Sequence, residues 1–259
     1  MRPNQPTNSN ILIENTVQEF WALAGGAPRY PCDIKIAITL TMPLELYALP
    51  GLHVSDVLDW THKVRISYRM PGHNRRLHGC LLADRDKGTI FYDAHDSEDE
   101  QRFTLAHELA HFLLDYQAPR QRAVAILGTS ILPVLDGDRS PTVAERVHAV
   151  LSTVPLGTMS HFMERPDEGL PATIVIDIED RADQLALELL APASSLHEMI
   201  SLSTAPRGFS KRLLFLTQQL IALYGLPATI ASSYARYVLA QLGEPGVRDW
   251  LFATDEENF

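Results

Sequence analysis

The chain has 259 residues, of which 46% are hydrophobic, so it is long enough to bury a sizeable core. It contains no run of about 18 apolar residues and no secretory signal pattern, and its two cysteines, Cys32 and Cys80, are typical of reduced thiols, so we expect a cytoplasmic protein without a membrane span. The formal net charge of −10 disfavours direct binding of nucleic acid, because phosphate contacts need a positive surface.

The first part of the chain, 1–62, is predicted to be mostly helical. Asn15 is a typical first residue for a helix that continues to Ala24, where two glycines end it. A Pro-Gly turn at 50–51 precedes a short helix at 55–62.

A β section follows, and then a long helix. Polar and apolar residues alternate over 63–70, and the short apolar runs 80–83 and 89–92 flank turn residues, which predicts a strand and a hairpin. Ser97 and Glu100 form a capping-box pattern at the start of the long helix. This helix has apolar residues on more than one side, so we expect it to pack against the sheet.

The remainder of the chain is predicted to be mainly helical. Segments 119–127 and 142–152 are helical in pattern, whereas 128–141 and 157–171 are irregular. A β-branched run at 172–177 predicts a strand before the next helix. The predicted helices after it are 179–190, 193–202, 208–224 and 227–242.

The chemistry of the chain is concentrated in the sequence HELAH, which runs from His107 to His111. Histidines four positions apart lie on one face of a helix, so both rings can reach one metal ion. Glu108 lies one position further round the helix, where it reaches the attacking water and acts as general base. The motif therefore predicts a metal-dependent hydrolase, with zinc as the first choice and manganese or iron as alternatives.

A catalytic zinc needs a third protein ligand, and no histidine follows at the spacing of metzincins. Glu179, at the start of a later helix, is the natural carboxylate ligand, and Asp183 would then hold a ligand histidine by hydrogen bonding to its second ring nitrogen. The alternative third ligands are Glu145, His148, His161, Glu164, Asp177 and the more distant Glu188. The candidate donors to the developing oxyanion are His148, His161, Tyr116 and Arg102.

Two stretches of this sequence resemble the ImmA/IrrE metallopeptidase family. Residues 102–112 (RFTLAHELAHF) look like the family's RFTxAHExxH helix, and residues 181–192 (RADQLALELLAP) look like its EANxFAxxLLMP helix. The resemblance implies His107, His111 and Glu179 as metal ligands and Glu108 as the catalytic residue. Asp183 stands where the family usually has Asn, and the long spacing from His111 to Glu179 makes 119–171 an insertion.

The resemblance also implies a fold, a domain organisation and a substrate. We expect an α+β, mostly helical zincin-like core at 63–192, with a small antiparallel or mixed sheet packed on the HExxH helix, between helical regions at 1–62 and 193–259. Family members cleave helix-turn-helix repressors and so relieve repression in stress responses, which implies a protein substrate of this kind. The alternatives are a zinc hydrolase of another amide substrate and a non-catalytic sensor on the same fold.

Overall fold

The computed structural model describes residues 8–66, 73–165, 181–202 and 206–242. The chain divides into two compact units. The sheet unit comprises 18–27 and 33–172, and the helical unit comprises 1–17, 28–32 and 173–259. Within the described ranges, no helix is both long enough and apolar enough to cross a membrane.

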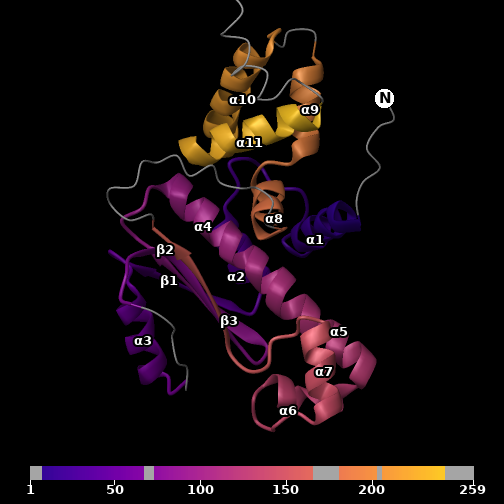
Figure 1. Cartoon of the computed structure of the whole chain (residues 1–259). Helices are drawn as coiled ribbons and strands as arrows, with labels where there is room; N and C mark the ends of the chain where they lie inside the picture. Colours follow the sequence, from indigo (N-terminus) through magenta and orange to yellow (C-terminus); the bar gives the residue numbers. More distant parts are fainter. Residues whose placement is uncertain (1–7, 67–72, 166–180, 203–205, 243–259) are drawn as a thin grey trace, which may run out of the picture. The chain divides into compact units, whose positions relative to one another are not determined.

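The sheet unit is built on one four-stranded mixed sheet (Figure 1). Its strands are β1 (Leu44–Leu49), β2 (Leu77–Asp84), β3 (Lys87–Asp93) and β4 (Met159–Glu164), in the order β1-β3-β2-β4. Strand β1 pairs with β3 in parallel, whereas β2 is antiparallel to both β3 and β4. The predicted hairpin is therefore present as β2 and β3, and together with the helices it confirms the predicted α+β class.

Three parts of the sheet unit differ from the sequence predictions. Strand β1 lies in the region that was predicted to be helical, and β4 lies in the stretch 157–171 that was predicted to be irregular. Helix α3 (Val54–Lys63) takes up the start of the strand predicted at 63–70, and 67–70 lie outside the described residues. Strand β4 lacks β-branched residues and is only partly buried, so its strand character comes from pairing with β2 and not from composition.

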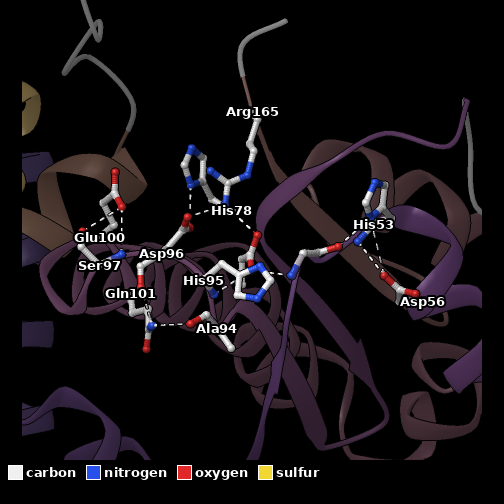
Figure 2. A network of polar contacts seen from close by, with 12 residues as sticks. His53, Asp56, His78, Ala94, His95, Asp96, Ser97, Glu100, Gln101 and Arg165 are labelled. Carbon is white, nitrogen blue, oxygen red and sulfur yellow. Dashed lines mark hydrogen bonds and ion pairs between the residues drawn. The ribbon is translucent and has the colours of Figure 1, made fainter. Parts of the chain in front are cut away.

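Helix α4 (Glu98–His111) is the long helix predicted from the sequence. Its first turn is stabilised by the expected capping box, in which the Ser97 backbone N–H donates to the Glu100 carboxylate at 3.0 Å (Figure 2). The helix contacts β2, β3 and β4 on the sheet and helix α2 (Ile34–Thr41). All residues from Phe103 to His111 are buried, which explains why apolar residues occur on several of its sides.

Beyond α4, the chain continues into the region predicted as an insertion. A π-helical segment (Phe112–Gln117) leads into α5 (Ala118–Leu127), which is followed by a short 3₁₀ turn (Thr129–Ile131), α6 (Leu132–Leu135) and α7 (Val143–Leu151). The elements from α5 to α7 share a small apolar core with the residue Val154 that follows them; its other members are Ala123, Ile131, Val134, Leu135 and Ala149. The chain then returns to the sheet as β4.

Two polar contacts attach the insertion to the β2–β3 turn. Arg85 donates to both carboxylate oxygens of Asp138 at 2.9 and 2.8 Å. Thr158 donates to Asp84 at 2.8 Å, immediately before β4 begins. The region 119–171 is therefore attached to the end of β2 and to the β2–β3 turn, close to the start of β4.

The helical unit contains the four predicted C-terminal helices, α8 (Arg181–Leu190), α9 (Ala193–Ser201), α10 (Phe209–Tyr224) and α11 (Ala228–Gln241). Helix α10 ends at Gly225, whose left-handed backbone (φ 62°) is the conformation that glycine adopts at low cost. Helix α1 (Asn8–Leu23) begins earlier than predicted and contributes residues to both units. The domain boundaries predicted at 62/63 and 192/193 stay a prediction.

Candidate metal centre

His107 and His111 lie one turn apart on α4, as their spacing predicts. Both residues are buried, and their Nε2 atoms are 3.2 Å apart. Zn–N bonds of about 2.0–2.1 Å in a tetrahedral site place two ligand nitrogens about 3.3 Å apart. The two rings are therefore already arranged as a pair that could bind one ion.

Glu108 is completely buried between α4 and the sheet. Its Oε2 atom accepts a hydrogen bond from His161 Nδ1 at 3.0 Å, whereas Oε1 has no hydrogen-bond partner. A buried carboxylate oxygen without a partner is costly, so the position of Oε1 favours a further polar group such as a water molecule. Gly79 on β2 lets α4 approach the sheet closely, because a Cβ there would lie 2.4 Å from Thr104 Cγ2 and 3.3 Å from Glu108 Oε1.

Asp115 is a site residue that the sequence predictions missed. His111 Nδ1 lies 2.7 Å from Asp115 Oδ2, so the carboxylate accepts the Nδ1–H and leaves the Nε2 lone pair available. The signal was present in the sequence, since Asp115 follows His111 by four positions in the same helical segment. Asp183, which was predicted for this type of contact, belongs to the helical unit, and its role stays a prediction.

His161 on β4 is brought to the same place by strand pairing. It is the register partner of Leu81, and Gly79, two residues earlier on β2, faces α4. Since paired residues point to the same face of a sheet and side chains alternate along a strand, His161 also faces α4. Its ring stacks on His111 with a centroid distance of 3.6 Å and an interplanar angle of 21°.

His107, His111 and His161 together form a group that could hold a metal ion. One ring nitrogen of each lies within 4.8 Å of the other two. Imidazole nitrogen is a preferred ligand of zinc and of several other divalent metals. Among the alternative third ligands named from the sequence, His161 is the one that the described structure brings to the histidine pair.

A charged network fixes the end of β4 (Figure 2). The Arg165 guanidinium donates to Asp93 Oδ2 at 2.8 Å and also to Asp96, which in turn binds His78 Nδ1 at 2.8 Å. Burial opposes ionisation of Asp93, but the backbone N–H groups of His95 and Gly51 and the Arg165 guanidinium outweigh it and hold the pKa of Asp93 below its usual value.

Several other candidates from the sequence are engaged elsewhere. The Tyr116 hydroxyl donates to the Arg85 carbonyl at 2.6 Å, and Glu164 pairs with Arg75. Hydrogen bonds from Arg139 and from the Thr142 backbone lower the pKa of Glu145 to about 2.

The remaining candidates are His148, Glu188, Arg102, Asp177 and Glu179. His148 lies on α7 within the insertion, and Glu188 is bonded within the helical unit. Arg102 on α4 stays a candidate donor. Asp177 and Glu179 lie outside the described residues, so Glu179 as a ligand stays a prediction.

Residues 61–130 match the family model of the M78 peptidases, described as the IrrE N-terminal-like domain. This match confirms the resemblance to the ImmA/IrrE family. The IrrE-like segment, 61–130, contains β2, β3, α4 and the start of the insertion, and so it includes His107, Glu108, His111 and Asp115. It ends before β4, so His161 is contributed by a part of the chain that the family model does not match. No curated protein matches the chain.

Proposed function

We propose that this protein is a metallopeptidase that hydrolyses a peptide bond of a protein substrate. The observation that carries the proposal is the buried HELAH helix within an M78 peptidase domain, with the two Nε2 atoms 3.2 Å apart. Here Asp115 fixes the His111 ring with Nε2 directed at His107, which is the arrangement of a metal-ligating histidine.

The residues at the site fit a divalent metal, with zinc as the proposed ion. His107 and His111 would hold it through Nε2, and the buried, unpartnered Oε1 of Glu108 fits a site that also holds water. When bound, the ion supplies Lewis acidity, which acidifies water and polarises the scissile carbonyl.

Glu108 is the proposed general base. It takes a proton from the attacking water as the new C–O bond forms, and then passes that proton to the nitrogen of the leaving amine as the C–N bond breaks. Oε1 is free for this proton transfer because the hydrogen bond from His161 occupies Oε2. The close approach of Gly79 and the complete burial of Glu108 keep the carboxylate in one position.

The proposed substrate is a helix-turn-helix repressor, whose cleavage relieves transcriptional repression in a stress response. This part of the proposal is supported by the ImmA/IrrE resemblance alone. A cytoplasmic location is consistent with the two cysteines, which are buried and free. Direct binding of nucleic acid is not part of the proposal, because the chain has a formal net charge of −10.

The test compares the zinc-loaded wild-type protein with Glu108→Gln and with Glu98→Gln, an exposed glutamate on the same helix. Each is incubated with a proteome-derived peptide library and with a panel of purified helix-turn-helix repressors, and mass spectrometry identifies the products. We expect the wild type and Glu98→Gln to cleave, and Glu108→Gln to bind zinc without cleaving. Cleavage by Glu108→Gln at the wild-type rate would exclude Glu108 as the base, and no cleavage by the loaded wild type in either arm would contradict the proposed function.

A further inference from the structure

The two oxygens of the Glu108 carboxylate lie in different surroundings. Oε2 accepts a hydrogen bond from His161 Nδ1 at 3.0 Å, whereas Oε1 has no hydrogen-bond partner among the described residues. A general base needs this difference, because one oxygen must face the attacking water while the rest of the carboxylate is held still. The contact with His161 therefore lies on the oxygen that the proposed proton transfer does not use.

A hydrogen bond of this kind decides the orientation of a buried glutamate. The last torsion of the side chain has a broad, roughly two-fold preference, so packing alone leaves the carboxylate free to rotate. A directional N–H donor at 3.0 Å from Oε2 removes this freedom. Because Glu108 is completely buried, bulk water does not compete for that oxygen.

The ring of His161 contacts the histidine pair but is not oriented to bind the same ion. It stacks on His111 with centroids 3.6 Å apart and an interplanar angle of 21°. The lone pair of an imidazole nitrogen lies in the plane of its ring, so two nearly parallel rings direct their lone pairs side by side and not toward one point. A tetrahedral ion needs ligands that converge on it. His161 is thus left to act through Nδ1, and the third ligand position stays open for the glutamate that the family resemblance implies, Glu179.

Strand pairing directs His161 toward α4. Its neighbour Phe162 packs against an apolar cluster that the sheet shares with α3. Side chains alternate along a strand, so His161 points to the other face, which α4 covers. Just beyond the strand, Arg165 binds the buried carboxylates of Asp93 and Asp96 (Figure 2). The donor is therefore held by a rigid element, as a precisely placed site requires.

We propose that His161 is a positioning residue for the general base: its Nδ1–H holds Oε2 of Glu108, so that Oε1 faces the attacking water. In this role His161 acts through Glu108 and not on the reacting atoms. The inference rests on the proposed function and goes beyond it, because the residue comes from β4, outside the segment 61–130 that the family model matches.

The experiment compares two substitutions of His161 that both remove the ring but differ in the donor. Asn places an amide N–H close to where Nδ1 of histidine lies, and Leu has a similar shape without a donor. The zinc-loaded variants and wild type are assayed with the library peptide that the wild type cleaves fastest, and His62→Leu, at an exposed position on α3, is the control. We expect His161→Leu to lower kcat by about 100-fold with little change in KM, and His161→Asn to recover most of this loss. Equal kcat values for the two variants, or a kcat of His161→Leu at the level of the control, would overturn the inference.

Zinc affinity, measured by competition with a chromophoric chelator, separates positioning of the base from metal binding. Loss of a hydrogen-bonded group behind a metal ligand costs about 10–100-fold in affinity, and loss of a ligand costs more. We expect both His161 variants to stay within about tenfold of the wild type. A loss of more than about tenfold would show that His161 acts on the metal and would overturn the inference.

NMR of the wild type tests the contact itself and does not depend on how a variant folds. Long-range proton–nitrogen correlation distinguishes protonated from unprotonated ring nitrogens, and the His161 signals are identified by their absence from His161→Asn. At about pH 8, where an ordinary histidine is neutral, we expect a proton on Nδ1 and none on Nε2, both with and without zinc. A proton on Nε2 alone would overturn the inference.

The failure of this inference can be distinguished from failure of the proposed function. If the wild type cleaves peptides, Glu108→Gln does not, and the two His161 variants are equal, only the role of His161 is wrong. If the wild type cleaves nothing, the proposed function is overturned, and His161 then has no base to position.

Discussion

Glu188 in the helical unit should make the stability of this protein depend on pH. Its carboxylate lies at the junction of α8 and α9, where both oxygens are 3.2 Å from the Ala193 backbone N–H and one is 3.4 Å from the Tyr234 hydroxyl. Burial raises the pKa of Glu188 to about 7 from an ordinary value of 4.5, and the Ala193 and Tyr234 hydrogen bonds offset only part of the effect of burial.

The sign of the effect follows from the two pKa values. Below pH 4.5 the carboxyl is neutral in both the folded and the unfolded chain, so burial carries no charge penalty. As the pH rises towards 7, the unfolded chain ionises first, and the free energy of unfolding falls. The difference between 4.5 and about 7 corresponds to a loss of about 3 kcal/mol, which persists at higher pH.

Glu188→Gln removes this penalty because the amide does not ionise, while its carbonyl oxygen can still accept the Ala193 N–H. Relative to the wild type, we expect the variant to be more stable by up to about 3 kcal/mol near pH 8 and about equal near pH 4. The assay is urea unfolding followed by circular dichroism across this range, with Glu198→Gln, an exposed glutamate on α9, as the control. A stability difference between Glu188→Gln and the wild type that stays constant with pH would refute the reasoning.

Three further predictions concern the candidate metal centre. Gly79→Ala places a methyl group 2.4 Å from Thr104 Cγ2 and 3.3 Å from Glu108 Oε1, so we expect stability to fall by about 1–3 kcal/mol and peptide cleavage to be lost; a variant with normal melting temperature and activity would show that this close approach of α4 to β2 is not required. Asp115→Asn should weaken zinc binding by about 10–100-fold in a chelator competition, and unchanged affinity would exclude a role for this carboxylate. Arg165→Met leaves the buried Asp93 carboxylate without its counter-ion, so we expect a lower melting temperature, and an unchanged one would show that β4 does not need this anchor.

Much of the candidate site could be predicted because its residues are close to one another in the sequence. The spacing of His107 and His111 determines that they share a helix face, and the Ser97 and Glu100 pattern determines where that helix begins. Asp115 follows from the same rule, although it was overlooked. Such features depend only on helical geometry, so no knowledge of the tertiary structure is needed to find them.

The sheet was harder to predict, and β4 shows why. Its sequence, Met-Ser-His-Phe-Met-Glu, has little intrinsic strand preference, and it becomes a strand because it pairs with β2 at the edge of the sheet. Strand β1 was missed for a related reason, since it pairs in parallel with β3, which lies far along the chain. Pairing partners of this kind are set by packing and not by neighbouring residues.

The sequence by itself determined the HELAH helix, its metal-binding chemistry and the family to which it is similar, because a helix of this kind is specified by residues within a few turns. Only the tertiary structure decided that His161, 53 positions after Glu108, lies against that helix with its ring on His111. The register between β4 and β2 and the network at Arg165 bring it there, and both join residues far apart in the chain. The region 119–171, which the sequence spacing predicts to be an insertion, thus contributes a side chain to the candidate metal centre.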